Sequence, residues 1–253
     1  MTRPVAIVTG GNRGIGLACV DALAAGGFDI IVADIAEAPA DELKAVVDHH
    51  EAEFRYCISD ISNLDSHAAV VSSALDAFHR IDCLVNNAGI ASPVRGDLLH
   101  LEPANFDKVL DLNLRGTVFL TQAVVNAMLR YVGDVQRTII NVTSISAEYA
   151  SPERADYCIS KAGLSMWTKV LALRLAAEGI PVFEVRPGIV RTEMTASASA
   201  KYDALIANGL VPMRRWGEAH DIGDAVAALA SGRMAFATGS VLNLDGGLAV
   251  PRL

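Results

Sequence analysis

A tyrosine and a lysine stand four residues apart at Tyr157 and Lys161. Four residues make about one turn of an α-helix, so in a helix the two side chains share a face. A phenol with its ordinary pKa of about 10 is a poor base at neutral pH, but a cation a few ångströms away favours the phenolate and lowers that pKa. The pair is therefore either a surface contact between neighbouring turns or a phenol that can move protons. The elements around it decide between the two.

A second hydroxyl is predicted to face the same site. Ser144 ends the run TIINVTS (138–144), thirteen residues before Tyr157. The carboxyl ends of strands in a doubly wound sheet face the ligand crevice. A serine hydroxyl there can hydrogen-bond a substrate oxygen whose charge changes during a reaction.

The loop between these hydroxyls is rich in charge. Glu148, Arg154 and Asp156 are either solvated or select a polar substrate. Tyr149 lies in the same loop and has Glu153, not a lysine, four residues downstream. We therefore expect Tyr149 to be a wall of the substrate pocket or a packing residue rather than a proton carrier.

A glycine-rich segment, TGGNRGIG (9–16), follows the first apolar run, VAIVT (5–9). Its glycines fall at positions 10, 11, 14 and 16, so it is not a GxGxxG fingerprint. A strand, a glycine-rich turn and a helix in this order aim backbone N–H groups and a helix N-terminus at a diphosphate. The sequence therefore predicts a dinucleotide cradle at this turn.

An acidic residue ends the second predicted strand at the position expected for a ribose-binding carboxylate. Asp34 lies 18 residues after Gly16, close to the offset of about 20 at which such a carboxylate binds the adenosine 2′-OH. It would repel a 2′-phosphate, which Arg13 could instead bind. We expect NAD, with NADP as the alternative. Asp60, after the third strand, either reaches adenine or begins a helix.

Short β-branched runs alternate with longer helical stretches along the whole chain. The predicted helices span residues 15–25, 41–51, 63–78 with Ser62 as N-cap, 106–130 and 156–177. The predicted strands span residues 5–9, 29–34, 54–60, 83–89, 138–144, 181–188 and 240–247. Most of these strands are continuous hydrophobic runs, as in a parallel sheet covered by helices on both faces.

The pattern predicts an α/β fold: one doubly wound Rossmann-type domain over residues 1–253 with a seven-stranded, mostly parallel sheet. Residues 191–216 break the alternation and form either a substrate lid or a disordered surface loop. No uninterrupted apolar run is long enough to span a membrane, and the N-terminus does not resemble a signal peptide. We therefore expect a cytoplasmic protein.

The 253 residues include 52% hydrophobic and 20% charged residues, with a net charge of −8. An acidic chain is a poor partner for nucleic acid, whose phosphates require a basic surface. The four cysteines form no CxxC pair, and the six histidines have no ligand spacing, so we expect no metal site.

Taken together, these motifs resemble those of the short-chain dehydrogenase/reductase family. They occur in the same order as in that family, and the resemblance covers essentially the whole chain. TGGNRGIG matches the family's TGxxxGxG turn, NNAG (86–89) its motif after the fourth strand, and PGIVRT (187–192) its later post-strand motif. Asn113 matches its helix asparagine, while Ser144, Tyr157 and Lys161 match its catalytic set. Within the family the chain is similar to 3-oxoacyl reductases.

The resemblance implies roles for individual residues. Tyr157 is the acid/base, Ser144 binds the substrate oxygen, and Lys161 holds the nicotinamide ribose and lowers the phenol pKa. Asn113 organises a water that links Lys161 to solvent, or else only bonds its own helix backbone. Thr192 and the backbone near Val190 bind the carboxamide. The predicted cofactor-binding residues are Gly10, Asn12, Arg13, Gly14, Ile15, Gly16, Asp34, Asp60, Ile61, Asn87, Ala88, Gly89, Tyr157, Lys161, Pro187, Gly188, Val190 and Thr192.

The expected activity is NAD(P)-dependent interconversion of a secondary alcohol and a ketone. A small polyol, sugar or hydroxy acid is favoured, because an acidic protein offers little to an acidic carrier protein and Asp34 predicts NAD. A 3-oxoacyl thioester, on acyl carrier protein or CoA, is the alternative. A non-catalytic dinucleotide-binding regulator would have lost Ser144, Tyr157 or Lys161, and all three are present. By resemblance, the helices that hold Asn113 and Tyr157 also pack in homodimers or homotetramers.

Overall fold

The computed structural model of the protein describes residues 3–130, 135–196 and 198–251. Its seven strands form one sheet in the order β3-β2-β1-β4-β5-β6-β7, and all six neighbouring pairs are parallel. The predicted doubly wound α/β sheet is therefore confirmed. The strands are β1 (Val5–Thr9), β2 (Asp29–Asp34), β3 (Phe54–Ile58), β4 (Cys83–Asn86), β5 (Thr138–Val142), β6 (Val182–Pro187) and β7 (Val241–Leu244).

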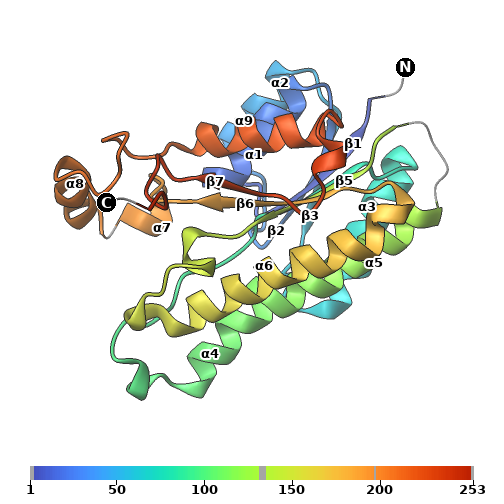
Figure 1. The fold of residues 1–253 in the computed structure, drawn as a ribbon. Coiled ribbons are helices and arrows are strands. Elements are labelled where there is room, and N and C mark those ends of the chain that lie inside the picture. Colours follow the sequence, from blue (N-terminus) through green and yellow to red (C-terminus); the bar gives the residue numbers. More distant parts are fainter. Residues whose placement is uncertain (1–2, 131–134, 197, 252–253) are drawn as a thin grey trace.

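Helices cover both faces of the sheet (Figure 1). One face packs against α1 (Gly14–Ala25), α2 (Asp41–His49) and α9 (Ala219–Ala230), and the other against α3 (His67–Phe78), α5 (Thr117–Arg130) and α6 (Ala155–Leu175). Successive strand residues enter opposite cores, because side chains alternate across a sheet. Val8 and Val32 lie in the first core, and Ile7 and Ile31 in the second. A strand buried on both faces is therefore apolar at most of its positions, and a polar residue within it needs hydrogen-bond partners.

The predicted helix over residues 106–130 is three segments in the structure. It begins earlier, as α4 (Pro103–Leu110), passes through a π-helix (Asp111–Gly116) and continues as α5. Gly116 belongs to this widened turn, and a Cβ there would lie 2.2 Å from the Ile61 carbonyl oxygen. π-Helical turns within α-helices are frequent at functional sites.

Several element boundaries differ from those predicted. The third, fourth, fifth and seventh strands end earlier, because the residues that follow them turn toward the ligand edge of the sheet. Asn63, not Ser62, caps the turn before α3, where its side chain accepts the Asp65 N–H. Short 3₁₀ helices occupy Leu64–Ser66, Leu98–His100, Ile145–Ala147, Pro152–Arg154, Ala176–Glu178 and Ala235–Ala237.

The segment 191–216 is folded rather than irregular. It contains α7 (Glu193–Ala196) and α8 (Ser199–Ala207); residue 197 lies outside the described residues. Trp216 packs edge-on against Tyr202 with ring centroids 5.7 Å apart, and its Nε1 donates to Asp203 at 2.7 Å. Ile206 and Val211 complete a small apolar cluster with Trp216. This cluster gives the segment a core of its own, unlike a disordered loop.

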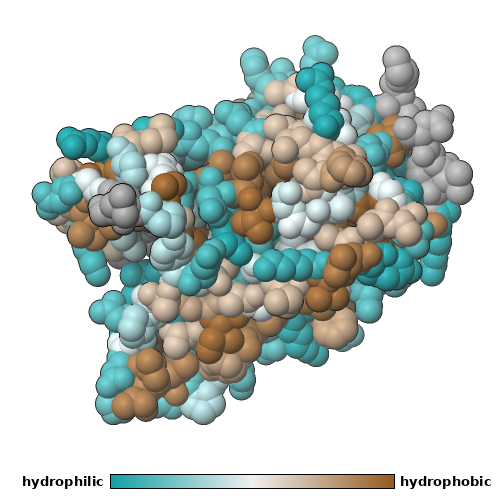
Figure 2. All heavy atoms as spheres, viewed as in Figure 1, coloured by the Kyte–Doolittle hydropathy of each residue, from teal (hydrophilic) through white to brown (hydrophobic). Residues whose placement is uncertain are grey.

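One helical face leaves a row of hydrophobic side chains exposed. Figure 2 shows hydrophobic side chains along the surface that α6 forms. We call Phe119 of α5 with Ile159, Met166, Val170 and Leu173 of α6 the apolar strip; each is at least 41% exposed. Within the described residues, no helix is both long and apolar enough to cross a membrane.

Candidate active site

The turn between β1 and α1 has the shape of a diphosphate cradle. Gly10 and Gly14 have φ of 64° and 56°, a conformation that side chains disfavour. A Cβ on Gly16 would lie 1.9 Å from the Gly10 carbonyl oxygen, so the turn and the helix can meet this closely only with glycine. Among the described residues, no side chain caps the first turn of α1. Its N–H groups can therefore bind an anion.

Asp34 stands beside this turn at the end of β2. Its carboxylate accepts the backbone N–H groups of Asn12 and Ala36, both at 3.1 Å. The Asn12 side chain is itself engaged with the loop before α2, accepting the Ala40 N–H at 2.7 Å and donating to the Ala38 carbonyl. Asn12 can therefore reach a cofactor best through its backbone, while Ile15 is partly buried against the core.

Arg13 extends from the turn to the lid segment. Its guanidinium pairs with the carboxylate of Glu193 on α7, and both side chains are largely exposed. The positive charge of Arg13 is thus balanced by Glu193, which lies 180 residues away in the sequence.

The NNAG segment after β4 packs directly on the cradle. The Asn87 amide donates to the carbonyls of Thr9 and Gly10 at 3.0 and 3.1 Å, and the Ala88 N–H donates to Thr9 Oγ1. A Cβ on Gly10 would come within 3.0 Å of the Ala88 Cα. The segment therefore fixes the position of the glycine turn, as close packing requires.

The two residues after β3 have structural partners of their own. The Asp60 carboxylate accepts both the backbone N–H and the hydroxyl of Ser62, at 2.9 and 2.7 Å, so it organises the turn that precedes α3. This agrees with the helix-start alternative. Ile61 is buried in the core beneath that turn.

The loop after β6 lies across the cleft from the cradle. Pro187 ends β6, and Gly188 donates its N–H to the Leu244 carbonyl. A Cβ on Gly188 would lie 2.7 Å from the Asp245 Cα, so only glycine fits there. The Thr195 hydroxyl organises the turn, donating to the Val190 carbonyl at 2.8 Å and accepting the Thr192 N–H. The Thr192 Cγ2 lies 3.9 Å from where a Cβ on Gly14 would stand, so the two segments predicted to bind the cofactor face each other.

The structure brings Ser144, Tyr157 and Lys161 together. Ser144 follows β5 and caps a short 3₁₀ helix by accepting the Ser146 N–H at 3.1 Å, while Tyr157 lies in the first turn of α6. Ser144 lies close enough to the Tyr157 phenol to lower the pKa of that phenol. The Lys161 Nζ lies 5.8 Å from the Tyr157 ring centroid and donates to the Val142 carbonyl at 3.1 Å. Tyr157 and Lys161 are both buried, so this is not a surface contact.

The titration of Tyr157 differs from the prediction. Burial raises its pKa above the ordinary value of 10.0, because a phenolate is poorly solvated there. Ser144 and the charge of Arg154 act in the opposite direction but do not reverse the shift. Burial also lowers the pKa of Lys161 to about 8, against the opposing charge of Glu184. Desolvation is therefore the largest influence on the pKa of the phenol.

Asn113 lies in the π-helix and bonds across the site. Its amide oxygen accepts the Ile90 N–H at 2.8 Å, and its nitrogen donates to the Ile90 carbonyl and to Ser160 Oγ at 3.0 and 3.1 Å. The alternative of a bond to its own helix backbone is wrong. A Cβ on Gly89 would lie 3.1 Å from Asn113 Oδ1 and 3.5 Å from Lys161 Nζ, which places amide and ammonium around one glycine.

Each of the three loop charges has a partner in the structure, although the Glu148 side chain is also 64% exposed to solvent. Glu148 pairs with Arg186 at 2.5 Å, and the buried Asp156 accepts the Ser92 hydroxyl at 2.5 Å. Arg154 stacks on the Tyr157 ring, with its guanidinium carbon 5.5 Å from the centroid. Tyr149 donates its hydroxyl to the Ala249 carbonyl at 2.8 Å, as a packing residue would.

Two features near the site were missed by sequence reasoning. Arg154 was noted only as a loop charge, although it faces the phenol and lowers its pKa. Glu184 and Arg186 lie in β6 and are buried as an ion pair with 2.5 Å between Oε1 and Nε. The sequence does contain a signal for this ion pair, because it places two charged residues in a strand that is predicted to be buried on both faces.

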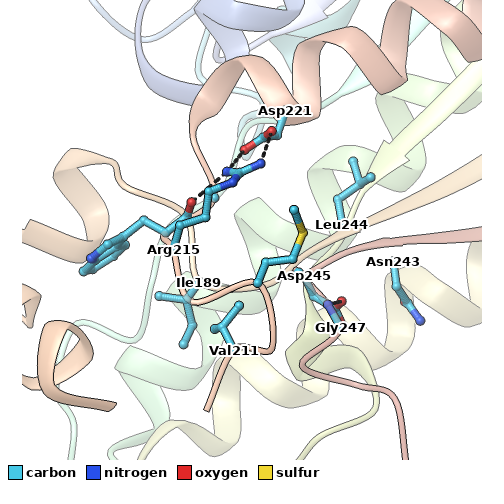
Figure 3. Close-up of a pocket in the computed structure, with 12 residues that line it drawn as sticks. Ile189, Val211, Arg215, Asp221, Asn243, Leu244, Asp245 and Gly247 are labelled. Atoms are coloured by element: carbon cyan, nitrogen blue, oxygen red, sulfur yellow. Dashed lines mark hydrogen bonds and ion pairs between the residues drawn. The ribbon is translucent and has the colours of Figure 1, made fainter. Parts of the chain in front are cut away.

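One cavity of the described structure lies apart from these hydroxyls. It has a volume of about 330 Å³ beyond the ends of β6 and β7, where Ile189, Val211 and Asp245 point toward it (Figure 3). Arg215 and Asp221 form one wall through two hydrogen bonds of 2.7 and 2.8 Å. None of the twelve described residues that line it belongs to the predicted catalytic set.

Known proteins resemble the chain over nearly its whole length. A family model described as "Enoyl-(Acyl carrier protein) reductase" matches residues 10–249. A 3-oxoacyl-[acyl-carrier-protein] reductase of Synechocystis is 34% identical over 253 residues, which are 99% of this chain and 98% of that protein. The crystal structure of a 3-oxoacyl-[acyl-carrier protein] reductase from Brucella melitensis in complex with NAD is 53% identical, with a TM-score of 0.96 and full coverage of both chains.

A more distant solved structure holds the other nicotinamide cofactor. A protein from Agrobacterium tumefaciens with bound NADP is 30% identical over 98% of this chain and 97% of its own, with a TM-score of 0.84. Fold, glycine cradle, catalytic set and full-length similarity agree. The chain therefore belongs to the short-chain dehydrogenase/reductase family and is an NAD(P)-dependent oxidoreductase similar to 3-oxoacyl-[acyl-carrier-protein] reductases.

Proposed function

We propose that the protein reduces the 3-oxo group of an acyl thioester to a secondary alcohol, using NADH. The observation that carries this proposal is the 53% identity, over both full chains, to a 3-oxoacyl-[acyl-carrier protein] reductase. It favours the thioester alternative over the small polyol, sugar or hydroxy acid that the charge of the chain suggested.

The residues of the site fit a dinucleotide and suit carbonyl reduction. The glycine turn would hold the diphosphate, Asp34 the adenosine ribose, and Thr192 with the backbone near Val190 the carboxamide. The bound cofactor supplies the hydride that the carbonyl carbon receives. Tyr157 gives its phenolic proton to the carbonyl oxygen, which then becomes a hydroxyl.

Three neighbours support that proton transfer. Ser144 hydrogen-bonds the same substrate oxygen while it gains negative charge. Lys161, as an ammonium, holds the nicotinamide ribose and stabilises the phenolate left on Tyr157. Asn113, close to Lys161 around Gly89, would organise the water through which the proton is replaced.

Two charges favour NAD over NADP. The Asp34 carboxylate, held by two backbone N–H groups, would repel a 2′-phosphate. Arg13, the cation best placed to attract that phosphate, is paired with Glu193. The relative at 53% identity carries NAD, whereas the relative at 30% identity carries NADP.

Initial rates followed at 340 nm test the proposal. The substrates are a 3-oxoacyl-CoA, the same acyl group on acyl carrier protein, a trans-2-enoyl-CoA and a set of small ketones, each with NADH and NADPH. We expect kcat/KM for a 3-oxoacyl thioester with NADH to exceed that for the enoyl thioester and the small ketones at least about tenfold, or about 1.4 kcal/mol. The CoA and carrier-protein arms share the thioester and distinguish its source.

Two results would contradict the proposal. A preference for the enoyl thioester would make the protein a C=C reductase, in line with the description of the matching family model. A preference for small ketones would restore the small-alcohol substrate class.

A further inference from the structure

A carboxylate is buried in the middle of the sheet, behind the helix that carries Tyr157. Glu184 is fully buried in β6, a strand of the parallel sheet between β5 and β7. An ionised carboxylate in such a place is costly unless it is paired and hydrogen-bonded. A carboxylate in the apolar run VFEV therefore needs ion-pair and hydrogen-bond partners.

Glu184 has three such partners. Its Oε1 accepts the Thr143 hydroxyl at 2.7 Å and the Arg186 Nε at 2.5 Å, and its Oε2 accepts the Ser165 hydroxyl at 2.8 Å. Arg186 in turn donates to Ser165 at 2.8 Å and to Glu148 at 2.5 Å. We call these five residues the carboxylate network. Two carboxylates and one guanidinium give it one net negative charge.

The network is anchored next to the groups that hold Lys161. Ser165 lies four residues after Lys161 on α6, so the two share a helical face one turn apart. Thr143 follows Val142, whose carbonyl accepts the Lys161 Nζ. The Glu184 carboxylate therefore binds a residue one helical turn from Lys161 on α6 and the residue next to Val142, whose carbonyl binds the Lys161 ammonium.

Two titratable groups face Lys161 from the described elements that pack against it. Tyr157 lies on its own helix, and Glu184 faces it from β6. The loop after β4 and the π-helix present Gly89 and Asn113, which do not titrate. The electrostatic effects of Arg154, Cys158 and Tyr202 shift the pKa of Tyr157.

We propose that Glu184 is the buried counter-charge of Lys161, a positioning residue that keeps this lysine in its ammonium form. Arg186, Thr143 and Ser165 hold the Glu184 carboxylate in place. Glu148 supplies a second negative charge, so that the carboxylate network keeps one net negative charge after Arg186 is counted. The inference rests on the proposed role of Lys161 at the site and is independent of the acyl substrate.

The balance of charges explains the direction of the effect. Burial lowers the pKa of Lys161 to about 8, and the charge of Glu184 opposes that fall. Without the carboxylate, burial would act alone and the amine would lose its proton at a lower pH. At pH 7 a larger fraction of Lys161 would then be neutral, and a neutral amine cannot stabilise a phenolate.

Nuclear magnetic resonance of the lysine side chains measures this directly. The chain has five lysines, so ¹³Cε-labelled protein gives few signals, and the Lys161→Met variant identifies that of Lys161. In Glu184→Gln we expect the pKa of Lys161 to fall by at least about one pH unit. Glu184→Asp keeps the charge and should keep the pKa close to that of the original protein.

Two further variants separate charge from packing. Glu148→Gln removes the network's other carboxylate, whose side chain is 64% exposed, so the core is untouched; the pKa of Lys161 should fall here too, by a smaller amount. Glu178→Gln removes an exposed acid paired with Arg174 and should leave the pKa unchanged. An unchanged Lys161 pKa in folded Glu184→Gln would overturn the proposal. Should that variant not fold, an unchanged pKa in Glu148→Gln would do so.

Kinetics then connect the network to the reaction. The fall of kcat/KM at alkaline pH should move to lower pH in Glu184→Gln by the same amount as the Lys161 pKa, but not in Glu178→Gln. A Lys161 pKa that moves while the rate profile does not would count against the proposed role of Lys161, and the counter-charge would still stand. The two failures are thus distinguishable.

Discussion

Tyr157 and Lys161 lie where burial opposes the charged forms that proton transfer uses. The pKa of the phenol is raised and that of the ammonium is lowered to about 8. A site of this kind keeps its charges only through specific partners, such as Ser144 and Arg154 for the phenol and Glu184 for the ammonium. The fold therefore carries a cost in stability at residues that the reaction needs.

Replacing Lys161 by methionine should stabilise the protein while it removes activity. A pKa of about 8 instead of 10.5 corresponds to about 3 kcal/mol of unfavourable free energy for the charged lysine. Losing the hydrogen bond from Lys161 Nζ to the Val142 carbonyl lowers the free energy of unfolding by about 1 kcal/mol. We expect Lys161→Met to raise the free energy of unfolding at pH 7 by about 2 kcal/mol, as measured by urea denaturation without cofactor.

The same pair of pKa values fixes the pH dependence of this gain. The native protein loses the Lys161 proton near pH 8 and the unfolded chain near pH 10.5, so the original protein gains stability between these values. Methionine does not titrate, and the advantage of the variant should therefore shrink as the pH rises through that window. An equal difference at pH 7 and pH 10 would contradict the assignment.

Asp34→Asn should weaken the preference for NADH. The variant keeps the shape of the side chain but removes the charge that would repel a 2′-phosphate. We expect the ratio of kcat/KM for NADH to that for NADPH to fall at least about tenfold, or about 1.4 kcal/mol. Asp48→Asn, an exposed carboxylate on α2, is the control and should leave the ratio unchanged. A ratio unaffected by Asp34→Asn would remove the main argument for NAD.

At the scale of elements, close helix packing holds the cradle against the rest of the domain. α9 crosses α1, the helix that follows the glycine turn, and they approach at Gly223. A Cβ there would lie 2.3 Å from the Ala18 carbonyl oxygen. Backbone atoms cannot move aside as a flexible side chain can, so the helices would have to separate.

Gly223→Ala should therefore destabilise the protein by about 2 kcal/mol. Overpacking costs about 1–3 kcal/mol and outweighs a gain in helix propensity of at most about 1 kcal/mol. Gly96→Ala is the matched control, since a Cβ there meets no described atom within 4 Å, and should change stability by less than about 0.5 kcal/mol. Equal urea midpoints for the two variants would show that α1 and α9 tolerate separation.

The sequence predicts the sheet well because most strands are largely apolar runs, as burial on two faces requires. The motifs around Tyr157 likewise place Ser144, Asn113 and Lys161 correctly at one edge. α9 was missed, although Glu218 and Asp221 form a capping box and Ile222, Val226 and Leu229 recur at helical spacing.

Other features could not be read from local pattern at all. The π-helix around Asn113 depends on the contact of Gly116 with a distant loop. The partner of Arg13 lies 180 residues away, and that of Glu148 lies 38 residues away. Tertiary structure alone decides which charges meet.

At the scale of the whole molecule, the apolar strip on α5 and α6 is the feature that a monomer explains least. Ile159, Met166, Val170 and Leu173 follow one helical face and remain exposed. Exposed hydrophobic rows of this kind mark interaction surfaces. We propose that the protein self-associates through this strip, as a dimer or within a tetramer.

Leu173→Glu should dissociate the assembly. A charge buried in an apolar interface is costly, so we expect the mass from light scattering to fall toward the 26.7 kDa of one chain. Leu99→Glu is the control, because Leu99 is 81% exposed against 83% for Leu173 but lies outside the strip. A monomeric original protein, or no change in Leu173→Glu, would contradict this interface.

The central claim is that Tyr157 transfers the proton in an NAD-dependent reduction. The most direct test is the initial rate of NADH oxidation with a 3-oxoacyl thioester for Tyr157→Phe and Tyr149→Phe. Phenylalanine keeps the ring of Tyr157 and removes only the acid/base group, so kcat should fall by a factor of about 10²–10⁴. Tyr149→Phe, which loses only the bond to Ala249, should keep most of the activity. Full turnover by Tyr157→Phe would contradict the account.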